Sequence, residues 1–310
     1  MTATEQPESS APRPVTPLSV IANLIRGGLI GLAELVPGVS GGTLALITGV
    51  YERLIDSANR VLRGEIRRAE WGMIIPLMIG MVLMVFSMAG VMESFVTGHP
   101  ELARGLFLGM VAASFGVPLT LIDRKDLATG AQKVRAGIVI LPVAILFFFL
   151  TGLGGGPTND DPSLILVFFA AAIAICALVL PGVSGSFFLL VIGIYAATVG
   201  AVSDRNIVYL LVFAAGALFG LTLFVKLLHW LLHHHHTIVM LVMAGLMLGS
   251  LRALWPWQGP DRELLAPGPD APLVFGLTVV GAVVVIALVI ADAKLGASAQ
   301  DGSNSRPPSK

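Results

Sequence analysis

The sequence predicts an all-α polytopic membrane protein with two inverted repeats, each a re-entrant helical hairpin broken by Pro-Gly and followed by three transmembrane helices. Of the 310 residues, 55% are hydrophobic and only 12% are charged, about half the charged fraction of a soluble domain. The mean hydropathy is +0.88. Apolar runs long enough to cross a bilayer recur along the chain, and a broken run occurs twice. These observations exclude a soluble enzyme and a disordered protein.

The charge balance and the cysteine content narrow the class further. The chain carries 19 Lys and Arg residues against 19 Asp and Glu residues, so it has no excess of basic groups for nucleic acid. Cys176 is the single cysteine and lies in an apolar run. A single cysteine excludes a disulfide framework and a cysteine-based zinc cluster. We therefore expect no nucleic-acid partner.

Both ends of the chain are polar. Residues 1–17 are rich in Pro and Ser, and residues 296–310 have a similar composition, which is typical of disordered segments. The first segment has neither a basic start nor a small-residue cleavage site, so a signal peptide is not expected. We expect a disordered N-terminus over 1–17 and a disordered tail over 296–310.

Between these ends, apolar runs alternate with short polar loops. A transmembrane helix needs about 20 apolar residues, within a range of about 17–25. Two longer runs, 18–55 and 163–202, are each interrupted midway by Pro-Gly-Val-Ser-Gly, and proline followed by small residues breaks a helix. Three plain runs follow each broken one. They are 73–92, 106–122 and 136–153 after the first, and 207–225, 238–254 and 273–291 after the second.

The two broken runs are copies of one another. Residues 37–51 (PGVSGGTLALITGVY) and 181–195 (PGVSGSFFLLVIGIY) are identical at 8 of 15 positions, at an offset of 144 residues. Further matches follow at an offset of 140 residues. The chain is therefore an internal duplication, with one membrane repeat over 18–155 and a second over 163–293.

The number of membrane crossings predicts how the repeats are oriented. A re-entrant broken run gives each repeat three crossings, and two short tilted spans give it five. Both counts are odd, so the second repeat is inverted relative to the first, as in many secondary transporters. Pieces of about 18 residues on each side of the proline are short for full spans, which favours re-entrant hairpins. A single kinked crossing would instead make the repeats parallel.

Basic residues predict the orientation of the chain, because they are enriched in cytoplasmic loops. The loops 60–68 and 124–135 carry four Lys or Arg residues each. The inverted arrangement places both loops and both termini on one side, and four arginines on the other. We expect a multi-pass protein of the plasma (inner) membrane with cytoplasmic N- and C-termini. A parallel arrangement would also group the two basic loops.

Each broken run offers a site for an anion. In lipid, backbone N–H and C=O groups must be satisfied internally, so a broken helix has to line a cavity or be buried in protein. The Pro-Gly-Val-Ser-Gly segment presents N–H groups, a serine hydroxyl and a new helix start, where partial positive charge attracts phosphate or carboxylate. Two copies predict a binding site at the interface of the repeats. A structural kink alone is the simpler alternative.

Two charged residues precede the first break. Arg26 and Glu34 lie eight residues apart in an apolar run, and charges inside a membrane are functional candidates by default. We expect Arg26 to bind an anion and Glu34 to carry a coupling proton. The alternative is mutual neutralisation near the interface, with Arg26 snorkelling. The candidate substrate-binding residues are Arg26, Glu34, Pro37, Gly38, Val39, Ser40, Gly41, Gly42, Thr43, Pro181, Gly182, Val183, Ser184, Gly185 and Ser186.

A histidine cluster follows one of the predicted spans. His229 precedes a run of four histidines at 233–236. The i, i+4 spacing of His229 and His233 places two metal ligands on one helix face. No carboxylate lies near them in the sequence, so we expect an interfacial histidine belt and no metal site.

The longer motif around the first break resembles a known family. It reads Arg-Gly-x-x-x-Gly-x-x-Glu-x-x-Pro-Gly-Val-Ser-Gly-Gly-Thr over 26–43, with Gly-Val-Tyr-Glu at 49–52 and Leu-Pro-Gly-Val-Ser-Gly-Ser at 180–186. These motifs resemble the polyprenyl phosphate transporter (PopT) family over about 18–293. The doubled motif is specific, whereas either half alone would be weak. The family commonly has Lys where this chain has Arg26, and both residues carry the same charge.

The resemblance implies a bacterial or archaeal plasma-membrane transporter that returns undecaprenyl phosphate, or a related polyprenyl phosphate, to the cytoplasmic leaflet for cell-wall synthesis. We expect alternating access, with the phosphate head bound at the two hairpin tips. The expected partners are that lipid, the membrane lipids and a coupling proton or cation, and no cofactor is expected. The alternative is a small-anion channel or a proton-coupled anion transporter. An enzyme is not expected, because no Ser–His–Asp or metal constellation is visible.

Overall fold

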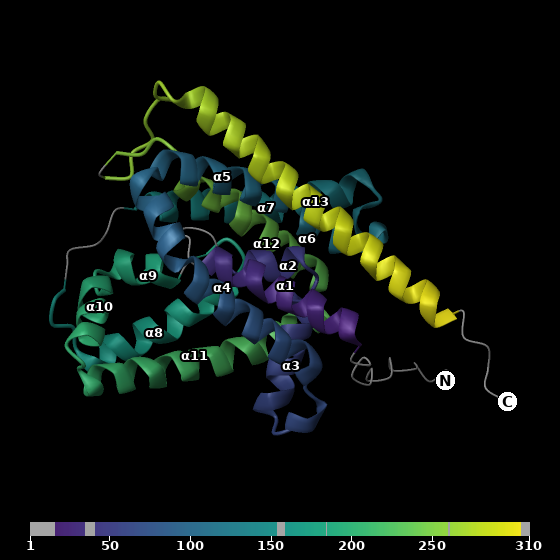
Figure 1. Ribbon diagram of the computed structural model, residues 1–310, viewed down its shortest axis with the longest axis horizontal. Helices are drawn as coiled ribbons and strands as arrows, with labels where there is room; N and C mark the ends of the chain where they lie inside the picture. Colours follow the sequence, from purple (N-terminus) through teal and green to yellow (C-terminus); the bar gives the residue numbers. More distant parts are fainter. Residues whose placement is uncertain (1–15, 35–40, 154–158, 184, 260, 305–310) are drawn as a thin grey trace.

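The structure, a computed structural model, describes residues 16–34, 41–153, 159–183, 185–259 and 261–304 (Figure 1). These residues form helices and connecting loops, with an isolated bridge between Gln258 and Leu264 and no strand within the described ranges. Six of the helices are long and apolar enough to cross a membrane. The predicted fold class, an all-α polytopic membrane protein, is confirmed.

The helices repeat the same order in the two halves. The first half contains α1 (Pro17–Glu34), α2 (Gly41–Ile47), α3 (Tyr51–Leu62), α4 (Trp71–Gly98), α5 (Pro100–Ser114), α6 (Gly116–Leu121) and α7 (Gly130–Gly152). The second half contains α8 (Leu164–Val179), α9 (Gly185–Ile192), α10 (Tyr195–Ser203), α11 (Ile207–His234), α12 (His236–Ser250) and α13 (Ala271–Asn304). Three short 3₁₀ turns connect them, η1 (Ile66–Arg68), η2 (Arg124–Leu127) and η3 (Leu251–Leu254).

Each of the six predicted plain runs overlaps one candidate span. The spans are α4, α5 together with α6, α7, α11, α12 with η3, and α13. Several helices extend beyond the apolar run, and α11 continues nine residues past position 225 to His234. A helix that has already formed grows at little cost, so it does not stop where the apolar residues stop.

Each broken unit contains three helices rather than the two arms of a simple hairpin. The second arm breaks again at Gly49 and at Gly193, whose φ angles are 68° and 88°. These two glycines are repeat equivalents at the offset of 144 residues, and positive φ is readily adopted only by glycine. The extra break separates the short helices α2 and α9 from α3 and α10. The glycine repeated before each tyrosine is the sequence signal for it.

Within each half, the first helix packs closely on the first spanning helix, α1 on α4 and α8 on α11. A Cβ atom on Gly80 would overlap the carbonyl oxygen of Leu24, and one on Gly220 would overlap that of Ala172. Small residues let helix backbones approach one another in membranes. The paired glycines at offset 140 therefore stand at the same helix–helix contact in each half, although Ala172 lies one turn beyond the counterpart of Leu24.

The remaining long helices are exchanged between the halves. Helix α5 of the first half packs on α13 of the second, and α12 of the second half packs on α7 of the first. Glycines again stand at the contacts, with Gly109 against Thr278 of α13 and Gly249 against Ala144 of α7. The exchange is reciprocal, because α12 is the repeat equivalent of α5 and α13 is that of α7.

The core lies around α12. In the spanning window of this helix 61% of the residues are buried, compared with 17% for α7, α11 and α13. Met240, Met243 and Met247 are fully buried, and methionine fills irregular gaps in such a core. The helices α7, α11 and α13 present long apolar faces outward, which suits contact with lipid.

The first residues of α1 and the last residues of α13 lie on the same side of the molecule, away from the start of α13 (Figure 1). Helix α1 begins at a reciprocal cap, in which Thr16 and Ser19 bond each other's backbone N–H groups at 3.0 and 3.2 Å. Helix α13 continues to Asn304, into the segment 296–310 for which disorder is expected from composition. This extension again follows from the low cost of prolonging an existing helix.

Candidate functional site

The two broken segments meet in the interior. The hydroxyl oxygen of Thr43, in the first turn of α2, accepts a 3.0 Å hydrogen bond from the backbone N–H of Gly182, 139 residues further along the chain. Thr43 is 1% exposed, and Gly182 has a φ of 79°. A buried backbone N–H is nearly always paired, and here the partner comes from the other repeat. The structure therefore brings one residue of each predicted segment into direct contact.

Tyr51 makes a second contact between the broken units. Its phenolic O–H donates a hydrogen bond of 3.1 Å to the carbonyl oxygen of Val179, at the end of α8 just before the second break. Tyr51 is buried, whereas its repeat equivalent Tyr195 is exposed. The last carbonyls of a helix lack partners within that helix, so this bond satisfies one of them and makes the interface asymmetric.

Glu34 occupies the start of α2. Its Oε1 atom accepts a 3.0 Å hydrogen bond from the backbone N–H of Gly41, the first residue of that helix. A carboxylate is favourable at this position because the free N–H groups carry partial positive charge. The sequence predicts this end of the helix as a place for the anion of a ligand. The structure places an anionic side chain of the protein there, so a phosphate would have to displace it or bind beside it.

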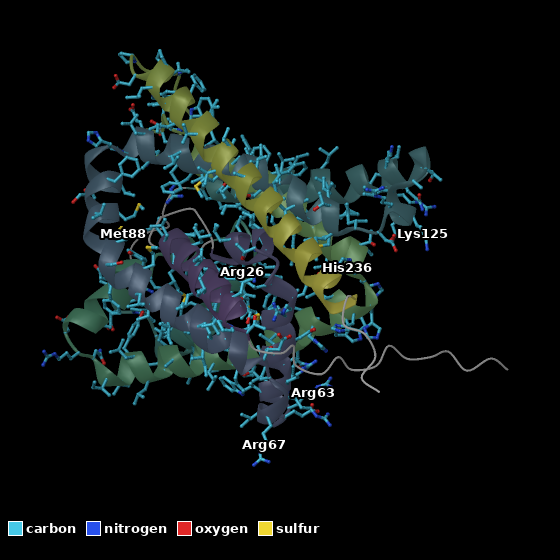
Figure 2. All side chains as sticks on the ribbon, turned by 45° about the vertical axis from the view of Figure 1, so that its right-hand side comes forward. Arg26, Arg63, Arg67, Met88, Lys125 and His236 are labelled. Atoms are coloured by element: carbon cyan, nitrogen blue, oxygen red, sulfur yellow. The ribbon has the colours of Figure 1, made fainter. Side chains whose placement is uncertain are left out.

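Arg26 lies on α1, two turns before Glu34. Its Nη1 atom donates a 3.2 Å hydrogen bond to Oδ1 of Asn23, one turn earlier on the same helix. Asn23 is buried and is not among the site residues predicted from the sequence. Its position three residues before Arg26 in an apolar run is the sequence feature that could have identified it. Figure 2 shows Arg26 in the middle of the molecule, whereas Arg67 and Lys125 lie at its periphery.

The remaining predicted residues are placed only in part. Gly42 lies beside Thr43 in α2, and Pro181 and Val183 flank Gly182 in the second break. Gly185 begins α9, and its Cβ position faces the Ala174 carbonyl oxygen of α8. Outside the described residues lie Pro37, Gly38, Val39, Ser40 and Ser184, and also the side chain of Ser186. Their part in a site stays a prediction.

Two arginines come together where α5 meets the segment between η3 and α13. Arg104 of α5 donates a hydrogen bond of 3.3 Å to the carbonyl oxygen of Pro256. Burial of the Arg262 guanidinium, together with the charge of Arg104 nearby, lowers the pKa of Arg262. Two half-buried cations close together favour an anion beside them.

The histidine cluster has carboxylate neighbours that the linear sequence does not reveal. His229 Nδ1 lies 3.0 Å from Asp56 Oδ1, and His236 Nε2 lies 2.9 Å from Glu52 Oε1. Both carboxylates belong to α3, more than 170 residues away in sequence. The histidines therefore connect the first broken unit to α11 and α12 of the second half, and do more than form a belt at the interface.

We expect that Thr43→Val weakens the contact between the broken units. Valine has nearly the shape of threonine but cannot accept the hydrogen bond from Gly182, and a buried unpaired N–H costs about 1–3 kcal/mol. The free energy of unfolding in detergent should fall by that amount, while Thr43→Ser, which keeps the hydroxyl, should lose less. Equal losses in the two variants would show that this hydrogen bond contributes little.

Comparisons with known proteins agree with the resemblance seen in the sequence. The sequence profile of an undecaprenyl phosphate translocase-like family matches residues 30–266. A polyprenyl-phosphate transporter of Vibrio cholerae serotype O1 is 33% identical over 270 residues, covering 83% of this chain and 85% of the relative. A polyprenyl-phosphate transporter of Staphylococcus aureus is 32% identical over 246 residues, covering 76% of this chain and 86% of the relative. No solved structure matches the chain.

Proposed function

The chain belongs to the undecaprenyl phosphate translocase-like family, and from this premise we propose that it carries a polyprenyl phosphate, undecaprenyl phosphate foremost, between the leaflets of the plasma membrane. The family is one of transporters and not of enzymes. The observation that carries the proposal is the contact between the two broken segments, where the Thr43 hydroxyl accepts a hydrogen bond from the Gly182 N–H in the interior.

The physical problem is the phosphate head. A bare charge in the hydrocarbon core is very costly, because little compensates for its lost hydration. The prenyl tail has no such problem and can stay in the bilayer throughout. A protein therefore has to supply hydrogen-bond donors and positive charge to the head alone. Arg26 is a group of this kind, and so is the Gly41 N–H at the start of α2 once Glu34 releases it.

The proposed movement is alternating access. The two halves, taken as inverted repeats, rock against one another so that the site opens first to one leaflet and then to the other. The exchanged pairs, α5 with α13 and α12 with α7, support this proposal. In each pair a long helix of one half packs on a long helix of the other, so a movement of one half is transmitted to the other. The cations Arg104 and Arg262 lie at the end that we assign to the outside, and the chain termini at the cytoplasmic end.

Glu34 is proposed as the group that couples binding to a proton. In the structure its carboxylate already accepts the N–H of Gly41, so a phosphate approaching that helix start meets a like charge. Protonation of Glu34 would remove this repulsion and admit the phosphate. Release of the proton on the other side would restore the carboxylate and expel the lipid.

Glu34→Gln tests this role. Glutamine keeps an oxygen for the Gly41 N–H but carries no charge at any pH, so lipid binding should become tighter while transport loses its response to a pH gradient. Transport of labelled lipid, measured with and without an imposed gradient, checks both expectations. A gradient response equal to that of the unaltered protein would show that Glu34 does not carry the coupling proton.

The proposal as a whole is tested in liposomes. Purified protein should accelerate the movement of labelled undecaprenyl phosphate between leaflets relative to empty vesicles, and protein inactivated by heat is the control. A soluble anion trapped in the same vesicles should not leak. If folded protein does not accelerate lipid movement, the proposal is wrong. Anion flux that is insensitive to added lipid would indicate a small-anion channel instead.

A further inference from the structure

We propose that Asp56, His229 and His233 form a binding site for a divalent transition-metal ion, Zn²⁺ above all, which joins α3 of the first half to α11 of the second. The potential ligand atoms of these three residues all lie within 4.8 Å of one another. One carboxylate and two imidazoles are a ligand set that Zn²⁺ readily accepts, and three protein ligands leave a fourth position for water.

The distance between two of the three ligand atoms fits an ion of this size, and the third ligand atom lies within 4.8 Å of both. Zn–N and Zn–O bonds of about 2.0–2.2 Å at tetrahedral angles separate two ligand atoms by about 3.3 Å. His229 Nδ1 and Asp56 Oδ1 are 3.0 Å apart. Replacing the shared proton of this pair by a metal ion therefore requires a shift of only a few tenths of an ångström. The hydrogen bond holds the two ligands in place when the metal is absent.

His233 is oriented as a metal ligand is. Its Nδ1 atom lies 2.8 Å from the carbonyl oxygen of His229, and because a carbonyl oxygen only accepts, Nδ1 must carry the proton. The Nε2 atom is then left with a free lone pair. Histidines that bind metals almost always donate their other ring N–H in this way, which fixes both the tautomer and the ring. The two imidazole centroids lie 4.2 Å apart.

The site is open enough for an ion to enter. The side chains of His229 and Asp56 are 22% and 34% exposed, and His233 is exposed. Glu52, one turn before Asp56 on α3, adds a further negative charge nearby. Arg63 is close enough to act electrostatically on His229 and opposes the binding of a cation, but it occupies none of the three ligands.

The internal duplication does not repeat this ligand set. The repeat counterpart of Asp56 is Gly200, and the counterparts of His229 and His233 are Ala89 and Glu93, so the other half cannot form the same set. Helix α3 lies against α11 (Figure 1). An ion bridging them would hold the first broken unit against the second half. If the halves rock against one another during transport, the bound ion should slow the transport cycle. This consequence rests on the proposed function.

The binding experiment uses full-length protein purified on a tag that contains no histidine. Titration calorimetry with ZnCl₂ should give one ion per chain, and Co²⁺ should give the absorption bands of a low-symmetry site. Asp56→Asn and His233→Ala should each weaken binding by more than about 100-fold, because losing a ligand costs more than the 10–100-fold typical of losing its supporting partner.

His234→Ala is the matched control. His234 is also exposed and also donates to a helix carbonyl, that of Trp230, at 2.9 Å. It belongs to the same histidine run but not to the three-residue group, so its removal should leave Zn²⁺ binding unchanged. Equal losses in His234→Ala and His233→Ala, or no binding by the unaltered protein, would overturn the proposal. Thermal unfolding without metal shows that the variants fold.

The consequence for transport has its own readout. Zn²⁺ should slow the transport of labelled lipid by the unaltered protein and by His234→Ala, but not by His233→Ala. A chelator should reverse the effect. Zn²⁺ binding without any effect on transport would confirm the site and overturn its action on the cycle. Binding that persists in a preparation with no lipid transport would leave the site standing and count against the proposed function alone.

Discussion

Replacing Arg26 with alanine is expected to lower the transport rate of polyprenyl phosphate about 10- to 100-fold. A hydrogen bond to a charged group contributes about 1.5–3 kcal/mol, and about 1.4 kcal/mol corresponds to a factor of ten. Arg26 is half-buried on α1, and its guanidinium donates a hydrogen bond to the buried Asn23. The measurement is the initial rate of leaflet exchange of labelled lipid in liposomes containing equal amounts of folded protein.

Two variants separate charge from position. Arg26→Lys keeps the charge and should retain much of the rate, although it loses the paired geometry of a guanidinium. Arg67→Ala removes an exposed charge at the periphery (Figure 2) and should leave the rate unchanged. If Arg26→Ala folds and transports at the rate of the unaltered protein, Arg26 is not part of the phosphate site.

The second large effect is expected at the exchanged helices. Gly109→Leu should lower the free energy of unfolding by more than about 3 kcal/mol, which is the upper range for overpacking an interior. A Cβ at this position already overlaps the carbonyl oxygen of Thr278 on α13, and a full leucine side chain would push the two helices apart. Thermal unfolding in detergent, followed by tryptophan fluorescence, measures the loss.

Gly276→Leu is the control on the partner helix. Gly276 is exposed and nothing lies within 4 Å of its Cβ position, so leucine there faces lipid and the stability should change little. Equal stability of Gly109→Leu and Gly276→Leu would contradict the close packing of α5 on α13. Since this pair crosses from one half to the other, a destabilised Gly109→Leu should also transport slowly.

Much of the fold follows from the sequence because the membrane imposes simple rules. The lengths of the apolar runs predict six spans in the correct order, and Pro-Gly breaks two further runs. The repeat at 37–51 and 181–195 predicts that the same break occurs twice. The second break, at Gly49 and Gly193, also has a sequence signal, which is a glycine repeated in both copies. Because no proline accompanies that glycine, the break is harder to predict.

Less of the candidate site can be predicted from the sequence. Composition and rarity identify Arg26 and Glu34, because charges are expensive in an apolar run. They do not show what each side chain contacts. Glu34 bonds the N–H of Gly41 only because the chain turns back on itself, and Asn23 becomes notable only when Arg26 is seen to bond it.

The membrane class, the duplication and the broken segments can be read from residues close together along the chain. Packing was needed to show which helices the halves exchange, that Thr43 contacts Gly182, and that Asp56 of α3 lies beside His229 of α11. The physical reason is distance along the chain. Contacts between residues more than 100 positions apart are set by how whole helices pack, and no local pattern of apolar and polar residues records that packing.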